Sequence, residues 1–424
     1  MTDQTPLNGA ARQGIILHVP WPILHRRLFP TLLSLFCVLL APGSMGADTT
    51  ALVEANTAFG LDLYAQLKSR PGNLFFSPYS ISTALAITCA GAKGQTEKRM
   101  ADLLHLPQDQ AAVPRGFAEL QRQLAEAEKY KGIQLNIANA LWAQQGHTFL
   151  PHFLDIARND FLANVNQVEF MTRAEAARLD INQWVAQKTQ NRIQDLLPPR
   201  SLDAFTRLVL ANAIYFKGLW TIPFEKAATA TQPFHLTRAS RAYVPLMHHL
   251  ADVKYSENAD FQAAELPYCG NQLSMVILLP CQIDGCGHLE SQLTPVWLWN
   301  SLARMKRQTV DLFIPRFKAT SSFALRPPLA QLGMPDAFGP QADFSGMDGT
   351  RLLSISDVFH KAWVEVNEEG SEAPAATAIV SEKSEAPPAS RLVFRADHPF
   401  IYLIRDTRSG SVLSLADWLI RVNS

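Results

Sequence analysis

Histidine and cysteine residues are the first candidates for chemistry in this chain of 424 residues. His248 and His249 are adjacent, and adjacent side chains of a strand point to opposite faces, so the pair does not predict a metal site. Cys281 and Cys286 could close a small disulfide loop, whereas Cys89 lies in an apolar run typical of a buried free thiol. No Cys-x-x-Cys pair accompanies them, so we expect no bound metal.

The sequence motifs of common enzyme classes are absent. Gly285–Gly287 begins a Gly-x-Gly pattern, but Glu290 occupies the position of the third glycine in a dinucleotide-binding fingerprint. The sequence has no P-loop, no zinc-protease motif and no nucleophile elbow. No nucleophile is placed beside a base. We therefore expect a protein that is not an enzyme, with no catalytic residues and no cofactor.

The charge balance restricts the partners. The chain has 38 Lys and Arg against 38 Asp and Glu, whereas nucleic-acid and polybasic membrane surfaces need an excess of basic residues. We therefore expect no nucleic-acid partner. With 47% hydrophobic residues and 23 phenylalanines, the composition predicts a globular protein with a sizeable core.

The segment 367–391 has neither a helical period nor a tight-turn pattern. In a compact domain, a connection longer than about 15 residues without secondary structure is usually functional or disordered. From Ser371 to Ser381 every second residue is small or apolar, while Glu372 and Glu382 fall in the other set. This alternation favours a strand with one face suited to burial, but the Ala-rich composition is also typical of a flexible linker. The segment is therefore a linker, or a loop that becomes a strand in a second state.

Helical patterns cluster early in the chain and strand patterns late. This order predicts an α+β fold rather than repeated βαβ units. No Pro/Gly-rich linker divides the chain into independent domains. The expected helices run from 51 to the Pro71-Gly72 stop and over 80–90, 96–104 and 180–193, and the expected strands cover 135–143, 207–216, 272–279, 309–314, 399–405 and 411–422.

Four motifs, in this order along the chain, resemble the serpin family. They are NLFFSPYS at 73–80, LANAIYFKGLW at 210–220, HKAWVEVNEEGSEA at 360–373 and DHPFIYLIR at 397–405. The resemblance covers essentially the whole chain after its N-terminal segment. It implies a serpin fold with three β-sheets, about nine helices and an exposed reactive-centre loop at about 368–392.

The resemblance also implies a mechanism. In serpins, a target protease cleaves the loop and forms an acyl-enzyme, and the freed arm inserts as a central strand of the main sheet. Insertion deforms the protease before deacylation, which is a form of strand addition to a sheet. The implied partner is a trypsin-like or elastase-like serine protease, with cysteine proteases as a further class. The alternative is a non-inhibitory serpin that acts as a binding protein or chaperone.

The resemblance assigns two groups of site residues. The first is a hinge, in which the glycine tolerates the backbone change that insertion requires and a charge on the first inward residue would be costly to bury. The second, called the shutter, is a polar cluster beneath the opening strands, whose members could also simply satisfy buried polar groups. The expected hinge is Glu368, Glu369, Gly370, Ser371, Glu372, Ala373, Pro374, Ala375 and Ala376, and the expected shutter is Ser77, Ser80, Asn212 and His360.

The reactive bond has two candidates. Counting sixteen residues from Glu368, as the family pattern implies, gives Ser384-Glu385, which suits an elastase-like protease. One residue earlier, Lys383-Ser384 suits a trypsin-like enzyme with a carboxylate in its pocket. Pro374 departs from the family pattern because it has no amide hydrogen for a central strand, so insertion is expected to slow.

The N-terminus carries an export pattern. Arg26 and Arg27 precede the apolar residues 28–40, and small residues follow. This order is typical of a secretory signal peptide, and thirteen residues are few for a membrane span, although a retained anchor helix is the alternative. We expect a signal peptide at 1–47 and one serpin domain at 48–424. The mature protein is expected to be monomeric, without a membrane partner, and secreted, or periplasmic in a bacterium.

Overall fold

Helix α2 (Pro78–Ala90) lies at the centre of the fold in the computed structural model, which describes residues 45–70, 72–371 and 391–419. Ser77 caps its N-terminus, where the Ser77 hydroxyl accepts the Ser80 backbone N–H at 3.1 Å, and Pro78 occupies a position that needs no amide hydrogen. Twelve of its thirteen residues are buried, so α2 has no solvent-exposed face. The expected helix at 80–90 is confirmed.

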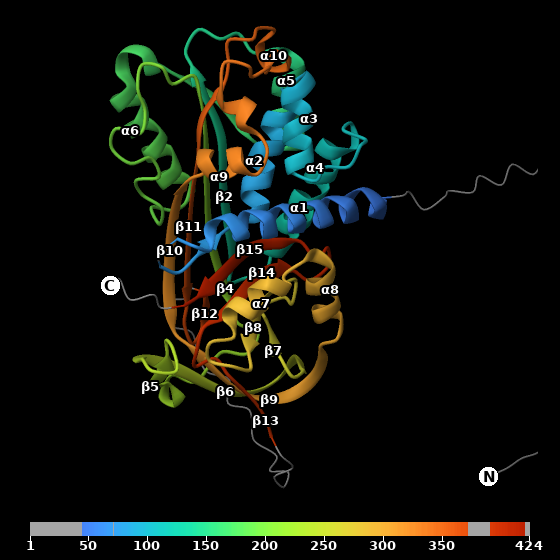
Figure 1. The fold of residues 1–424 in the computed structure, drawn as a ribbon, viewed down its shortest axis with the longest axis vertical. Coiled ribbons are helices and arrows are strands. Elements are labelled where there is room, and N and C mark those ends of the chain that lie inside the picture. Colours follow the sequence, from blue (N-terminus) through green and yellow to red (C-terminus); the bar gives the residue numbers. More distant parts are fainter. Residues whose placement is uncertain (1–44, 71, 372–390, 420–424) are drawn as a thin grey trace, which may run out of the picture. The chain divides into compact units, whose positions relative to one another are not determined.

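The other helices surround α2 and the two sheets (Figure 1). Two short 3-10 helices and one π-helical turn lie in the connections, namely η2 (Lys226–Ala228), η3 (Pro335–Phe338) and η1 (Ile156–Asp160). The remaining α-helices in the described residues are α1 (Met45–Leu67), α3 (Gly94–Leu103), α4 (Ala112–Glu128), α5 (Pro151–Asp155), α6 (Phe170–Lys188), α7 (Cys286–Gln292), α8 (Pro295–Ala303), α9 (Arg326–Gln331) and α10 (Ser345–Asp348).

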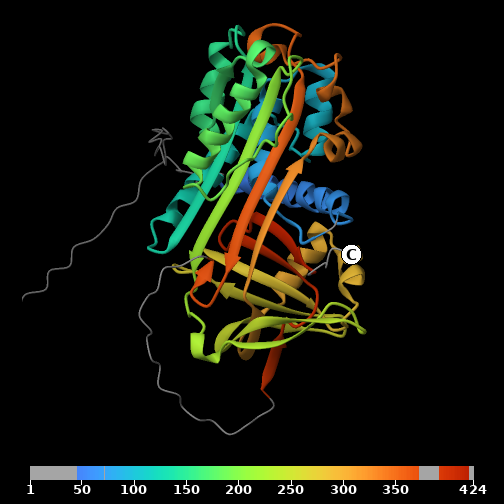
Figure 2. The same cartoon turned by 90° about the vertical axis from the view of Figure 1, so that its left-hand side faces the viewer.

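A six-stranded sheet runs along the long axis of residues 44–424, which form one compact unit (Figure 2). Its two central strands, β4 and β11, are parallel neighbours, and each has an antiparallel partner on its other side. The short strand β12 pairs with the end of β4. The strand order is β10 (Phe317–Ala324), β11 (Ile355–Val366), β4 (Leu208–Leu219), β2 (Ile133–Gln144) and β3 (Asn164–Val168), with β12 (Gly370–Ser371) beside β4.

Both faces of this sheet are covered. On one face, Val209 and Phe359 pack in a cluster with residues of α6. On the other face, Leu210 and Ile214 belong to the main core together with α2. Strand β4 is therefore buried on both sides, which explains why its sequence is almost continuously apolar instead of alternating.

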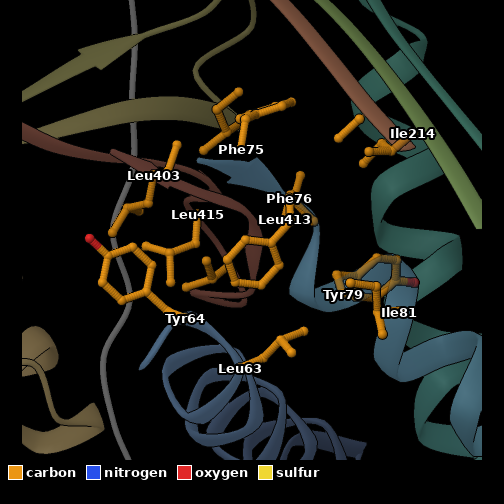
Figure 3. Packing of buried hydrophobic residues seen from close by; sticks show 14 of the residues in the cluster. Leu63, Tyr64, Phe75, Phe76, Tyr79, Ile81, Ile214, Leu403, Leu413 and Leu415 are labelled. Carbon is orange, nitrogen blue, oxygen red and sulfur yellow. The ribbon is translucent and has the colours of Figure 1, made fainter. Parts of the chain in front are cut away.

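A nine-stranded sheet forms the other half of the molecule. Its long strand β6 pairs with β9 along most of its length and with β7 at its end, so it joins these strands into one continuous sheet. Figure 3 shows Phe76 and Leu415 of this sheet on the side that faces Leu63 of α1, while Phe75 lies on the opposite side of its strand. The order is β1 (Phe75–Phe76), β15 (Val412–Trp418), β14 (Phe400–Asp406), β8 (Leu273–Pro280), β7 (Phe261–Pro267), β6 (Arg241–Glu257), β9 (Lys306–Pro315) and β13 (Leu392–Arg395), with β5 (Ala230–His235) beside β6.

The other candidates for chemistry are separate from one another. Cys281 is exposed and Cys286 is buried, and the structure has no disulfide between them. His248 contacts Asp311, while His249 packs its ring edge-on against Phe224. Within the described ranges, no group of three or more His, Cys, Asp or Glu residues is placed to hold a metal ion.

Candidate functional site: a hinge and a polar cluster on the six-stranded sheet

The site lies where strands β4 and β11 are paired side by side, and this boundary between the two strands is called the seam. The two strands pair in parallel until Trp363 lies opposite Tyr215. Beyond that point β12 pairs with β4 in the antiparallel sense, with Ser371 opposite Gly218. The chain reverses between β11 and β12 through a tight turn. The expected hinge residues Gly370 and Ser371 are therefore paired with the sheet as a two-residue strand.

The turn before β12, residues 367–370, is closed by hydrogen bonds. Asn367 N–H donates to the Gly370 carbonyl at 2.8 Å, and Gly370 N–H donates back to the Asn367 carbonyl at 3.2 Å. The Asn367 side-chain oxygen accepts from the Glu369 N–H at 3.0 Å. The backbone of the hinge is thus held in one conformation.

Gly370 is required for the close approach of this turn to β4. Its φ is +147°, a region that other residues rarely adopt, and an added Cβ would lie 2.0 Å from the Gly218 carbonyl oxygen. No other residue type fits at this position while β12 stays paired.

Ser371 is fully buried, at 0% exposure. Its hydroxyl lies 3.0 Å from the hydroxyl of Tyr268. The Tyr268 ring stacks on Trp220 with a centroid separation of 4.6 Å and meets Phe216 edge-on at 5.0 Å. Trp220 also donates its indole N–H to the Asn367 carbonyl at 2.9 Å, so the aromatic pair contacts both ends of the turn.

Two ion pairs fix the carboxylates of the hinge. Glu368 is 4% exposed, with Arg316 at 3.3 Å and the Thr229 hydroxyl at 2.8 Å. Glu369 is 9% exposed and lies 2.6 Å from Lys226 Nζ, and this hydrogen bond raises the pKa of Lys226. A cavity of about 550 Å³ opens beside these pairs. Lys226 and Arg316 line this cavity with half-exposed side chains, whereas both carboxylates are buried.

The expected shutter residues come together where helix α2 begins. His360 on β11 and Asn212 on β4 are register partners. His360 Nε2 accepts the Ser77 backbone N–H at 3.1 Å, so its proton lies on Nδ1, which donates to the Asn212 side-chain oxygen. The Asn212 amide donates to the Ser80 carbonyl at 2.8 Å. The cluster therefore crosses the seam between β4 and β11.

Burial sets the charge of this cluster. It lowers the pKa of His360 to about 3, because the side chain is fully enclosed and the charged form has no solvent. The imidazole is therefore neutral near pH 7, which agrees with its acceptor role toward Ser77. A proton on Nε2 would break that hydrogen bond.

Sequence reasoning missed Asn139, the fifth member of the cluster. It is the register partner of Asn212 on β2, accepts from the Asn212 amide, and accepts from the Ser80 hydroxyl at 3.2 Å. A signal was present, because Asn139 and Asn212 each lie between two alanines in an apolar strand. An amide in such a position needs a partner.

The structure places part of the expected hinge and corrects one expectation. Glu368, Glu369, Gly370 and Ser371 are buried, and Gly370 and Ser371 pair with β4, although the loop was expected to be exposed from 368 onward. The physical reason is that neither Gly370 nor Gly218 has a Cβ, so the turn can approach the backbone of β4 closely. The expected residues Glu372, Ala373, Pro374, Ala375, Ala376, Lys383, Ser384 and Glu385 lie outside the described residues.

Comparisons with known proteins agree with this geometry. A family model described as "Serpin (serine protease inhibitor)" matches residues 54–419. Human Serpin B3 is 39% identical over 381 residues, which cover 86% of this chain and 97% of that protein. The human leukocyte elastase inhibitor is 40% identical over 377 residues, covering 86% and 98%. The crystal structure of Serpin48 from the insect Tenebrio molitor has a TM-score of 0.79 at 30% identity, covering 88% of this chain and 98% of that one.

The same relatives correct the expected location. Serpin B3 and the leukocyte elastase inhibitor are intracellular, which points away from secretion, so the expectation of an extracellular or periplasmic protein is wrong. The relatives do not support the signal peptide either, and helix α1 already begins at Met45, before the expected cleavage site. A basic pair followed by a short apolar run is a compositional pattern, which does not by itself establish export.

No helix among the described residues has the length and apolar character needed to cross a membrane. The expected α+β serpin fold is confirmed, with ten α-helices in the described part of the chain. The family model spans most of the chain, and the relatives are close to 40% identical over nearly their whole length. The chain belongs to the serpin family of serine protease inhibitors, and it is not an enzyme.

Proposed function

We propose that this protein inhibits a serine protease as a suicide substrate. The protease serine attacks the carbonyl carbon of the reactive bond, the amine of the C-terminal fragment leaves, and an acyl-enzyme forms on the N-terminal arm. The arm then continues the strand that β12 has begun, between β4 and β11, and carries the protease with it. The observation that supports this proposal is the pairing of Ser371 with Gly218, next to the proposed path of the arm.

The register of β12 defines where an inserted arm would lie. Ser371 lies opposite Gly218, so each further residue of the arm pairs with the preceding residue of β4. Thr377 would then lie opposite Asn212, and Ser381 opposite Leu208, at the start of β4. Because alternate residues share a face, Thr377 would enter the polar cluster from the same side as Ser371.

Insertion must separate β4 from β11, and this breaks the hydrogen bond between His360 and Asn212. Leaving both groups buried without partners would cost about 1–3 kcal/mol each. In the proposed inserted state, the Thr377 hydroxyl lies between them and can both donate and accept. The polar cluster therefore controls opening and is satisfied again after insertion.

The reactive bond in this proposal is Ser384-Glu385, with Lys383-Ser384 as the alternative. The first suits an elastase-like protease, which the likeness to the leukocyte elastase inhibitor supports. The second suits a trypsin-like protease. Cysteine proteases are a further class of target.

A non-inhibitory role is the second candidate, and Pro374 favours it. In the inserted register Pro374 would lie opposite Tyr215 and could not donate to the ladder of a central strand. Slow insertion would allow deacylation to release the protease. The protein would then be cleaved as a plain substrate.

Denaturing gels after incubation with trypsin and with an elastase would separate these candidates. An inhibitor gives a complex that survives denaturation, and the mass of the released fragment identifies the bond. A fragment of 40 residues, 385–424, corresponds to cleavage after Ser384, and one of 41 residues, 384–424, to cleavage after Lys383. Complete cleavage of the loop by both enzymes without any complex would contradict the inhibitory proposal and favour the second candidate.

A further inference from the structure

We infer that Tyr268 is a positioning residue that holds the hinge docked in the sheet before any protease arrives. Release of its contact with Ser371 would then set how fast a protease engages the loop. The kinetic part of this inference rests on the proposed inhibitory function, whereas the docking itself does not.

The contact between Tyr268 and Ser371 joins two distant parts of the chain. Tyr268 directly follows β7 and forms a bridge with Trp220 at the end of β4. Its hydroxyl has Ser371 as its one hydrogen-bond partner among the described residues. Both residues are 0% exposed. The hydroxyl pair is thus the innermost contact of the docked hinge.

The space for this contact exists because Gly218 has no side chain. A Cβ on Gly218 would lie 2.7 Å from the Tyr268 ring. The ring can therefore lie directly beneath β4, with its hydroxyl toward the residue that pairs with Gly218. Trp220 and Phe216 hold the ring on its face and its edge, so the hydroxyl position is fixed.

The ion pairs of Glu368 and Glu369 hold the turn, but not the inserted residues. Their partners Arg316 and Lys226 have side chains that are 50% and 64% exposed. Such half-exposed pairs can persist while the chain beyond Gly370 leaves the sheet. The buried hydroxyl pair is different, because it exists only while Ser371 is docked.

Loss of one hydroxyl destabilises the docked state selectively. Tyr268→Phe leaves the Ser371 hydroxyl buried without a partner, and this cost disappears when the hinge moves into water. Ser371→Ala leaves the Tyr268 hydroxyl unpaired in the same way. The double variant removes both partners, and such paired replacement is close to neutral. The population of the docked state is therefore expected to fall in each single variant and to return to the wild-type level in the double variant.

Docking matters for the reaction because it removes residues 370–371 from the free part of the loop. Undocking lengthens the segment that a protease has to bind, so association becomes faster. After acylation the whole arm inserts, so the partition between trapping and deacylation stays the same. The expected signature is a faster association rate with an unchanged number of inhibitor molecules consumed per protease. A merely structural defect would raise that number.

Amide hydrogen exchange of residues 367–371 in the intact protein tests the docking. We expect slow exchange in the wild type, exchange faster by about 10-fold in Tyr268→Phe and in Ser371→Ala, and wild-type exchange in the double variant. Tyr402→Phe is the matched control, because it removes the hydroxyl of another buried tyrosine, one that has no hydrogen-bond partner among the described residues. That control should leave the exchange of 367–371 unchanged.

Unchanged exchange in Tyr268→Phe, or equally fast exchange in the double variant, would overturn the inference. The association rate is then measured with whichever of trypsin or elastase forms a complex. A rate equal to that of the wild type despite faster exchange would overturn its kinetic part. Failure to form any complex would contradict the proposed function and leave the exchange result standing.

Discussion

Protonation of His360 should lower the stability of the intact protein in mild acid. Burial lowers its pKa to about 3 in the folded chain, whereas an unfolded histidine titrates near about 6.5. Between these two values the unfolded chain binds a proton that the folded chain excludes. Stability is therefore complete above about pH 6.5 and falls as the pH drops toward 3.

The size of this loss follows from the two pKa values. Each pH unit between the two pKa values changes the free energy of unfolding by about 1.4 kcal/mol. The free energy of the first unfolding transition should therefore fall by about 2 kcal/mol between pH 7.5 and pH 5 because of this residue alone. The seam between β4 and β11 should open first, because the protonated ring can no longer accept the Ser77 N–H.

Urea unfolding of the wild type and of His360→Gln at several pH values measures the effect. Glutamine retains a donor and an acceptor but does not titrate, so its stability should depend less on pH by about 2 kcal/mol over this range. His152→Gln replaces an exposed histidine and should behave like the wild type. Equal pH dependence in the wild type and His360→Gln would refute the reasoning.

Three further changes test the inserted state and the polar cluster. The double variant E372A/A373E moves one carboxylate to the inward face of the arm and should abolish complex formation, because burying the charge costs several kcal/mol. The single variant E372A should still inhibit, and denaturing gels with the target protease distinguish the two results. Thr377→Val should leave the stability of the intact protein unchanged but lower that of the cleaved protein by about 1–2 kcal/mol, because Asn212 loses its proposed partner. Equal stability of the cleaved wild type and the cleaved variant would count against the proposed register. Asn139→Ala should destabilise the intact protein by about 1–3 kcal/mol in urea, and a change near zero would show that its hydrogen bonds are dispensable.

The periodic patterns located the regular buried elements well. Strands β4, β8 and β9 and helix α2 were predicted to within a few residues, because each has an uninterrupted apolar or alternating pattern. Helix α4 was missed, since Pro114 and Gly116 lie in its first turns and interrupt the signal. Strand β6 was missed because its exposure changes along its length as it passes from one partner strand to another.

Only the site residues that lie within linear sequence motifs could be predicted. Sequence motifs identified His360, Asn212, Ser77 and Ser80, and the structure brings them together. The contact of Tyr268 with Ser371 spans 103 residues of sequence, and no local pattern encodes it. The same is true of the buried turn, which depends on the close approach of Gly370 to the Gly218 carbonyl of a distant strand.

Insertion of the cleaved arm between β4 and β11 is the central claim. Beyond Ser371, which is already paired, insertion would add ten residues, 372–381, along β4, and each backbone hydrogen bond that they form is worth about 0.5–1.5 kcal/mol. Thermal unfolding of the intact protein and of the protein cleaved within its loop tests this directly. We predict that cleavage raises the unfolding temperature by at least about 10 °C in the wild type and not in E372A/A373E. An unchanged unfolding temperature after complete cleavage of the wild type would contradict the account.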